Sequence, residues 1–346
     1  MKKYHNLLFL FLLIFNIVKI SAQNQSDSLY KDFASHVKKP YLSVGALLQI
    51  VGDYQKERIF SSNNGFNISN MRIALYGDFD KGIGYFIQTN FISSPAILDA
   101  KLYFRFRKYL QLDIGLFKVP FSKEFLTPAS DIDFVNRAQI VDNFAPKRQI
   151  GMMINGRFLK NYIYYGIGIF NGNGFDGNVN DNNEFLYAGR IGFSSIFKPL
   201  NNDNNRFEIG INAASSNDKN INLGRGLLPH FEGNRELVGG DFRIIINGFL
   251  FSGDLIYANL NPIEGRIVKP SGFHLTIGYD LFSHSQVLIR LDSFKADNLQ
   301  QDSNLFIVGY NIWPSRISEI QINYIIPQHH DSFRNHQILI NTQIAF

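Results

Sequence analysis

Three cations lie close together in the one long stretch of the chain that does not resemble a β-strand. The stretch runs from Val119 to Gly151 and holds Arg137, Lys147 and Arg148. Guanidinium and ammonium groups gathered on one loop attract anions without making or breaking bonds. An insertion of this length is expected to be functional or disordered, and five large apolar side chains argue against disorder: Phe121, Phe125, Phe134, Val135 and Phe144. We therefore expect a loop that folds back into the protein.

The middle of this stretch carries a helix start signal. Ser130 is a preferred N-cap residue. Asp131 and Asp133 follow in the first turn, where acids interact favourably with the helix dipole. The pattern predicts a short helix that begins at Ser130 and includes Arg137.

Other combinations of chemically active residues are weak. His329-His330-Asp331 has metal-ligand composition, but a solvated exterior loop explains it better. The segment 171–178 has the composition of a calcium loop without EF-hand spacing, and turn chemistry accounts for it. Ser283-His284-Ser285 falls in a predicted turn, and no G-x-S-x-G or phosphate-cradling glycine loop is present. We predict no enzyme, no metal site and no cofactor.

Most of the remaining sequence alternates apolar and polar residues with period two, the pattern of strands with one apolar face. In 97–107 the apolar face begins with Leu98, and in 272–281 Phe273, Leu275 and Ile277 oppose His274 and Thr276. The pattern predicts sixteen strands, at residues 41–50, 66–79, 83–92, 97–107, 110–118, 149–159, 162–170, 185–196, 206–214, 235–246, 249–258, 272–281, 286–294, 304–312, 317–325 and 335–346.

Connection lengths favour a membrane barrel over a soluble sandwich. Odd-numbered connections are mostly long, about 9 to 30 residues, and 215–234 is predicted as one such loop. Even-numbered connections are mostly tight turns, and Asn247-Gly248 is the strongest two-residue hairpin signal. In lipid, a sheet can pair the backbone N–H and C=O groups of both edge strands only by closing into a barrel. We predict an all-β, transmembrane antiparallel barrel of about 16 strands with short periplasmic turns. A barrel of that size encloses an aqueous channel, and its long third extracellular loop, 119–148, folds into the pore.

The N-terminus and the composition fit export to the outer membrane of a Gram-negative cell. Residues 1–22 resemble a signal peptide, with Lys2 and Lys3 before an apolar run and a small-residue exit at Ala22. We expect a periplasmic lead-in at 23–39 and one porin domain at 40–346. The signal holds three of the 34 Lys and Arg residues and none of the 29 acids, which leaves a net charge of +2 and no support for nucleic-acid binding. The chain has no cysteine, so a large core or a membrane must stabilise it.

Aromatic residues mark the predicted strand ends, where interfacial belts form in membrane barrels. They are Tyr41, Tyr109, Tyr162, Tyr187 and Trp313. The chain ends on Phe346, and this resembles the C-terminal signature that the outer-membrane barrel assembly machinery recognises. We expect outer-membrane lipid and that machinery as partners.

Four motifs carry a family resemblance: Phe117-Lys118-x-Pro120-Phe121, Asp133-Phe134-x-x-Arg137, Ala145-Pro146-x-Arg148-x-x-Gly151 and Phe170-Asn171-Gly172. The chain resembles the phosphate-selective porins O and P, and the similarity spans most of its length. The resemblance implies a trimeric, sixteen-stranded porin. Phosphate selectivity in that family depends on a ladder of arginines and a ring of lysines. The strands that would carry the ladder do not align residue by residue, and the near-neutral charge argues against strict phosphate selection.

Strand parity supplies candidates for the pore lining. Basic residues predicted on the inward face are Arg72, Lys101, Arg190 and Arg290 at mid-strand, with Arg105, Arg107 and Arg243 lower. Acids predicted on that face are Asp78, Asp99, Asp113, Asp254 and Asp292. In one interpretation, the wall cations join Arg137, Lys147 and Arg148 in a positive constriction. In the other, they form ion pairs with these acids and stabilise the barrel. Pairing is the better interpretation for any single wall arginine, and a role in the constriction is the better one for Arg137 and Arg148.

The function predicted from sequence is passive diffusion of small anions, with phosphate or polyphosphate first, through a homotrimeric outer-membrane porin. Alternatives are a general or differently selective diffusion porin of the same family, a non-conducting structural or binding barrel, and an outer-membrane hydrolase.

Overall fold

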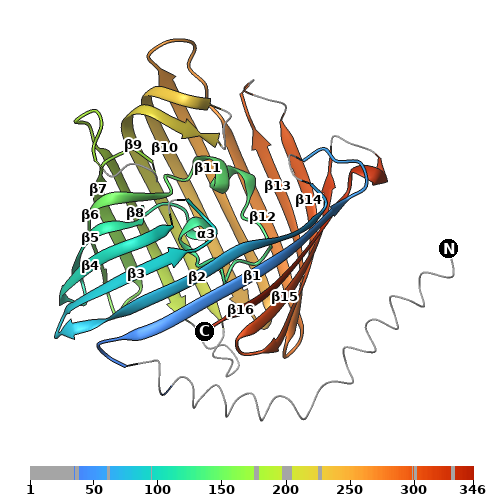
Figure 1. The fold of residues 1–346 in the computed structure, drawn as a ribbon, viewed down its shortest axis with the longest axis horizontal. Coiled ribbons are helices and arrows are strands. Elements are labelled where there is room, and N and C mark those ends of the chain that lie inside the picture. The colour runs from blue at the N-terminus through green and yellow to red at the C-terminus, as the bar shows by residue number, and fades with distance from the viewer. Residues whose placement is uncertain are drawn as a thin grey trace.

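The computed structural model describes residue 35 and residues 39–60, 63–94, 96–174, 179–196, 205–224, 228–297, 299, 302–328 and 332–346. The predicted signal peptide and nearly all of the predicted lead-in lie outside these residues. The described residues form sixteen antiparallel strands that close into one barrel, with β1 paired to β16 (Figure 1). The strands are β1 (Ser43–Gln55), β2 (Gly65–Asp80), β3 (Ile83–Asn90), β4 (Ile97–Arg107), β5 (Leu110–Lys118), β6 (Arg148–Phe158), β7 (Ile163–Phe170), β8 (Leu186–Ile196), β9 (Arg206–Leu223), β10 (Leu228–Ile246), β11 (Phe249–Pro262), β12 (Ser271–Phe282), β13 (Ser285–Lys295), β14 (Ser303–Ser315), β15 (Ser318–Pro327) and β16 (Gln337–Ala345).

Two short helices, α3 (Lys123–Leu126) and α4 (Gln139–Phe144), lie between β5 and β6, and a 3₁₀ turn, η3 (Phe333–Asn335), precedes β16. In this described part of the chain, no helix has the length and apolar character needed to cross a membrane. The strands enclose α3 in the lumen (Figure 1). The prediction of a long third loop folded into the barrel is therefore confirmed.

Period-two alternation was a reliable guide to the strands, and each of the sixteen predicted segments overlaps one of them. In β12, Phe273, Leu275 and Ile277 are 38–56% exposed, whereas His274 and Thr276 are buried. β12 thus presents apolar side chains outward and polar side chains inward, as a barrel in lipid requires. The hairpin prediction at Asn247-Gly248 is also confirmed, because both residues adopt positive φ (51° and 84°), as a type I′ turn requires.

The structure corrects the predicted face of Leu98. The register shifts between Gln88 and Thr89, which pair with Asp99 and Ile97 respectively and leave Leu98 without a partner. Ile97 is consequently 49% exposed on the outer surface, whereas Leu98 is 6% exposed. A one-residue bulge of this kind inverts the parity of a strand end, which a period-two pattern does not register.

The predicted 20-residue loop at 215–234 is also wrong. β9 continues to Leu223, β10 begins at Leu228, and the two strands pair along most of this length. The small and polar residues between Ser215 and Asn220 keep an alternating inward and outward order, so they extend the hairpin.

Trp313 is a third correction, because it lines a cavity in the lumen rather than an outer aromatic belt. The four predicted belt tyrosines are exposed, at 41–64%.

Apolar side chains from the β5–β6 connection fill part of the lumen. Phe134 is 1% exposed and packs with Leu250, Leu288 and other inward residues of the wall. Gly309 of β14 makes room for it, since a Cβ there would lie 2.9 Å from the Phe134 ring. The Phe134 ring of the loop therefore packs directly against Gly309 in the wall.

We predict that Gly309→Ala destabilises the barrel by about 1–3 kcal/mol, because the added methyl group overpacks the Phe134 ring. Urea titration of the protein in lipid vesicles measures the change. Gly240→Ala is the matched control, since its nearest neighbour would be 3.7 Å away at ordinary contact distance. Equal changes in the free energy of unfolding for the two substitutions would contradict the packing of the Phe134 ring against Gly309.

Candidate functional site: the inward loop and the cavity beside it

We call residues 119–147 the inward loop. α3 begins in this loop where the Ser122 Oγ accepts a hydrogen bond from the N–H of Phe125 at 3.2 Å. α4 buries Ile140 and Phe144, and the Phe144 ring stacks on Phe294 of β13 with centroids 6.1 Å apart. Burial of these side chains holds α4 against β11, β12 and β13 of the barrel wall.

The helix predicted to start at Ser130 is not formed. The Ser130 Oγ donates to the Asp131 carboxylate at 2.7 Å and caps no backbone N–H group. Arg137 lies before α4 rather than inside a helix. Ser122, rather than Ser130, is the residue whose side chain caps a helix in this loop. The local sequence did not show which of the two serines would be the N-cap.

Inward-facing amide side chains from β1, β14, β15 and β16 hydrogen-bond to the backbone of the inward loop. Gln49 donates to the carbonyl of Ala129 (3.2 Å), Gln343 to Ser130 (2.8 Å), Gln321 to Ile132 (2.8 Å) and Asn311 to Asp133 (2.8 Å), while the Asn323 Oδ1 accepts from the N–H of Val135 (2.8 Å). Backbone groups enclosed in a barrel need such partners, because unpaired ones are costly. These contacts fix the path of the loop across the lumen.

Ion pairs hold the same loop to the wall on the opposite side. They join Asp133 to Arg243 (2.7 and 2.9 Å), Glu124 to Arg290 (2.8 Å) and Lys123 to Glu208 (2.9 Å). The Arg290 guanidinium also lies over the Phe134 ring, 4.3 Å from its centroid. Two predicted pore cations, Arg290 and Arg243, are thus neutralised by acids of the loop.

The charge state of Glu124 follows from its neighbours. Burial by itself raises the pKa of this carboxyl group, but Arg290 and His274 outweigh the burial and hold the pKa below its ordinary value. Glu124 is therefore an ionised carboxylate at neutral pH.

Lys118 and Arg137 bind backbone carbonyl groups around the end of α3. The Lys118 Nζ donates to Phe125, Leu126 and Thr127 at 2.8–3.2 Å. Arg137 donates to Glu124 (3.1 Å) and Thr127 (2.7 Å). Cations favour the C-terminal end of a helix, where carbonyl groups lack partners. Neither residue forms an ion pair in these contacts.

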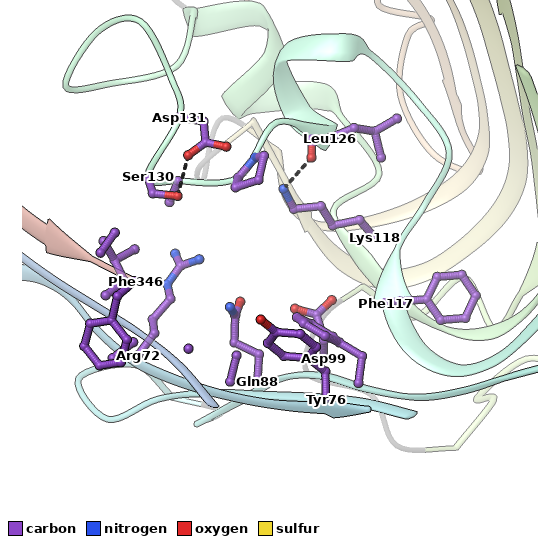
Figure 2. A pocket seen from close by; sticks show the side chains of 18 of the residues that line it. Arg72, Tyr76, Gln88, Asp99, Phe117, Lys118, Leu126, Ser130, Asp131 and Phe346 are labelled. Atoms are coloured by element: carbon purple, nitrogen blue, oxygen red, sulfur yellow. Dashed lines mark hydrogen bonds between the residues drawn. The ribbon is translucent and has the colours of Figure 1, made fainter. Parts of the chain in front are cut away.

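An open cavity of about 1010 Å³ runs between the inward loop and the wall formed by β1–β6 and β14–β16. In Figure 2, Arg72, Gln88 and Asp99 extend from the wall, and Ser130 and Asp131 of the loop lie across the open space. The basic residues of the lining are Arg72, Lys101, Arg105, Lys118, Arg148 and Arg316, and the acidic ones are Asp99, Asp131 and Glu319. Among described residues, cations therefore outnumber acids in this lining by six to three.

Several of these cations have carboxylate partners. Lys101 pairs with Asp113 at 2.7 Å, Arg148 with Asp99 at 3.1 Å, and Arg105 approaches Asp78 at 3.9 Å. These pairs confirm that all three acids face the lumen.

Arg72 differs from its neighbours. It donates to the Asn70 side chain at 2.8 Å and has no carboxylate partner within the part of the chain that the structure describes. No direct ion pair neutralises its charge at the cavity wall; the charge of Asp99, which pairs with Arg148, also acts on it.

The structure divides the predicted site residues into two groups. Arg72, Lys101, Arg105 and Arg148 line the open cavity together. The others do not line it: Arg137 holds carbonyl groups inside the loop, Lys147 is exposed at the loop end, Arg190 is buried against Asp241 and Tyr164, and Arg290 is bound to Glu124. The pairing interpretation is thus the better description of Arg190 and Arg290.

Lys118 is a lining residue that the sequence-based set omits. Strand parity counted from Asp113 and Phe117, which face inward, would place Lys118 and Arg148 on the outer face. Both instead line the cavity, because the chain leaves the sheet here and turns into the lumen. The position of Lys118 next to the insertion is the signal that could have identified it.

The weak motifs gain no support. His329-His330-Asp331 lies outside the described residues, as does part of 171–178. Ser283 and His284 form the turn between β12 and β13, as predicted.

We predict that a double-mutant cycle on Asp133 and Arg243 gives a coupling energy of about 1–3 kcal/mol, because the pair is bidentate and shielded from solvent. The side chains are 13% and 27% exposed. The matched control is Glu57 with Arg334, which has the same 2.7 Å separation but is 49% and 59% exposed, so about 0–1 kcal/mol is expected. Unfolding in lipid vesicles measures both cycles, and equal coupling would contradict the anchoring role of Asp133.

Solved outer-membrane proteins share this architecture. The anion-selective porin from Comamonas acidovorans matches with a TM-score of 0.63 at 12% identity, over 88% of this chain and 99% of that one. The outer membrane protein OmpT of Vibrio cholerae, in its trimer form, matches with a TM-score of 0.62 at 9% identity, over 88% and 99%. The outer membrane channel DcaP of Acinetobacter baumannii gives 0.55 at 10% identity, over 88% and 97%. These likenesses establish the fold.

No curated protein matches the chain. The family model described as phosphate-selective porin O and P matches residues 46–253, more than half of the sequence and the part that contains the inward loop. That family is one of porins, which are channel proteins. The chain therefore belongs to the phosphate-selective porin O and P family.

Proposed function

We propose that the protein is a porin for passive diffusion of small anions across the outer membrane of a Gram-negative cell. The observation that carries the proposal is the lining of the open cavity, where six cations face three acids. Arg72 contributes most, because its hydrogen-bond acceptor is an amide side chain, which leaves the charge of the guanidinium in place. The porin from Comamonas acidovorans, which has the same fold, is anion-selective, and this supports the same sign of selectivity here.

The mechanism is electrostatic. Low-dielectric walls focus the field of the cations on the aqueous path, which raises the local concentration of anions and lowers that of cations. No bond is made or broken, so transport follows the concentration gradient. Ions must also leave, and the pairs that Lys101 and Arg148 make with Asp113 and Asp99 moderate the field.

Phosphate or polyphosphate is the preferred solute that we propose within this class. Arg72 and Arg148 line one cavity, and guanidinium groups match phosphate oxygens with paired N–H donors. The family to which the chain belongs is described by that selectivity. A general or differently selective diffusion porin is the second candidate, and Asp131 and Glu319 in the same lining favour it.

We further propose a homotrimer in the outer membrane. The outward apolar faces, such as Phe273, Leu275 and Ile277, suit contact with lipid or with neighbouring barrels. The trimer form of a protein with the same fold supports this assembly.

In planar bilayers with a KCl gradient, we expect the wild-type channel to prefer chloride. Arg72→Gln should lower the ratio of anion to cation permeability at least about fivefold, since a unit charge beside the path is worth about 1 kcal/mol or more. Arg72→Gln/Arg148→Gln should lower the ratio further and move the reversal potential toward cations. Arg107→Gln is the control, because Arg107 is exposed at the periplasmic end of β4, outside the cavity lining. An unchanged reversal potential in the double variant would refute the anion path.

Phosphate preference has a separate test. Millimolar phosphate should reduce the chloride current of the wild-type channel, because a multivalent anion dwells longer beside Arg72 and Arg148. Arg72→Gln should weaken this block. A chloride current that phosphate leaves unchanged would favour the general porin, and the absence of any conductance would favour a non-conducting barrel.

A further inference from the structure

A second, smaller cavity lies on the other side of the inward loop. Its volume is about 30 Å³, enough for a bound water or ion, and it is enclosed by α3, β10, β11, β12 and β13. Three metal-binding side chains meet at this cavity: Glu124 from the loop, Asp254 from β11 and His274 from β12. Nothing in the anion path uses them.

The distances from the His274 Nε2 to the two carboxylates are compatible with coordination of one metal ion as well as with a long hydrogen bond to Asp254. The His274 Nε2 lies 3.3 Å from the Asp254 Oδ2 and 3.4 Å from the Glu124 Oε2. Charge-assisted N–H···O bonds are shorter, about 2.7–2.9 Å. Ligand atoms about 2.0–2.1 Å from a tetrahedral zinc ion are separated by about 3.3–3.4 Å. Both separations from the His274 Nε2 therefore match the edges of a zinc tetrahedron.

The carboxylate Oδ1 of Asp254 points to a missing partner. Asp254 is 5% exposed, and this oxygen accepts no hydrogen bond. A buried carboxylate oxygen without a partner is costly, and a cation bound at the Oδ2 of the same carboxylate would reduce that cost. Both neighbouring ligands are already oriented: Arg290 binds the Glu124 Oε1, and the Thr276 hydroxyl lies 3.4 Å from the His274 Nδ1. An oriented second ring nitrogen is a common feature of metal-binding histidines.

The charge of this small cavity also favours a cation. Its lining contains four acids, Glu124, Asp131, Asp133 and Asp254, and three permanent cations, Lys123, Arg243 and Arg290. These seven acidic and basic side chains, counted as ionised, sum to −1 before His274 is included. Binding of a divalent ion would change it to +1.

We propose that Glu124, Asp254 and His274 bind one divalent transition-metal ion of the Zn²⁺ class, with a water in the cavity as the fourth ligand. One imidazole with two carboxylates selects zinc-like ions over Mg²⁺ or Ca²⁺, which prefer oxygen ligands alone. The ion joins α3 of the inward loop to β11 and β12 and thereby fixes the loop against the wall. This role goes beyond the proposed transport function.

The test measures metal binding directly and uses no current. Full-length, untagged protein in detergent carries His329→Ala/His330→Ala, which removes the adjacent histidines of the sequence as competing ligands. After EDTA treatment, reloading with Zn²⁺ and dialysis, we expect about one zinc per chain by mass spectrometry and a higher unfolding temperature with zinc. His274→Gln should weaken zinc binding at least about 100-fold, because loss of a ligand exceeds the effect of its supporting contacts. His336→Gln, the control, should bind like the parent.

A spectroscopic measurement on the parent covers the case in which His274→Gln does not fold. The Co²⁺-loaded protein should show the visible spectrum of a four-coordinate site with one nitrogen and several oxygen ligands. Absence of retained zinc in the parent, undiminished binding in His274→Gln, or a six-coordinate oxygen-only cobalt spectrum would each overturn the proposal. Those results would identify the cluster as an ion pair of His274 with two carboxylates.

Discussion

The main constraint on this barrel is that a loop enclosed in its lumen must find hydrogen-bond partners on the wall. Amide side chains of β1, β14, β15 and β16 bind loop carbonyl and N–H groups on one side. Arg243 and Arg290 bind loop acids on the other. The wall therefore determines where the loop lies. The loop in turn determines which wall cations remain uncompensated.

Packing strengthens this asymmetry. Phe134 and Phe144 of the inward loop are buried against β13 and β14, where Gly309 leaves room for the first ring and Phe294 stacks on the second. Loop side chains thus occupy the part of the lumen next to β10–β13. The open cavity is left along β1–β6 and β14–β16. A barrel of sixteen strands is wide enough to hold both an apolar filling and an aqueous path.

Much of the fold could be predicted from the sequence, because each strand contacts lipid on one face and so shows period-two alternation. The predicted strand of 272–281 matches β12 almost residue for residue. The helix at Ser130 failed, since its capping signal is equally consistent with a side-chain contact to Asp131. Leu98 was assigned to the wrong face because a bulge changes parity without changing composition.

The candidate site was less predictable for a different reason. Arg290 lies 166 positions from its partner Glu124 in the sequence. A local sequence pattern cannot predict a contact between residues so far apart in the chain. Arg72 and Arg290 look alike in sequence, yet one faces the open cavity and the other is bound to the loop. Only the path of the loop separates them. Lys118 was missed because parity ceases to apply where the chain leaves the sheet.

Thiol accessibility tests the central claim, that the open path runs along one side of the inward loop while the loop fills the other. The chain has no cysteine, so single substitutions suffice. Gln88→Cys lies in the open cavity, and Thr276→Cys replaces a residue that is 2% exposed beside Arg290. An anionic thiosulfonate should react rapidly with Gln88→Cys and reduce its current, while Thr276→Cys should stay unmodified. Equal reaction and equal block at both positions would contradict the account.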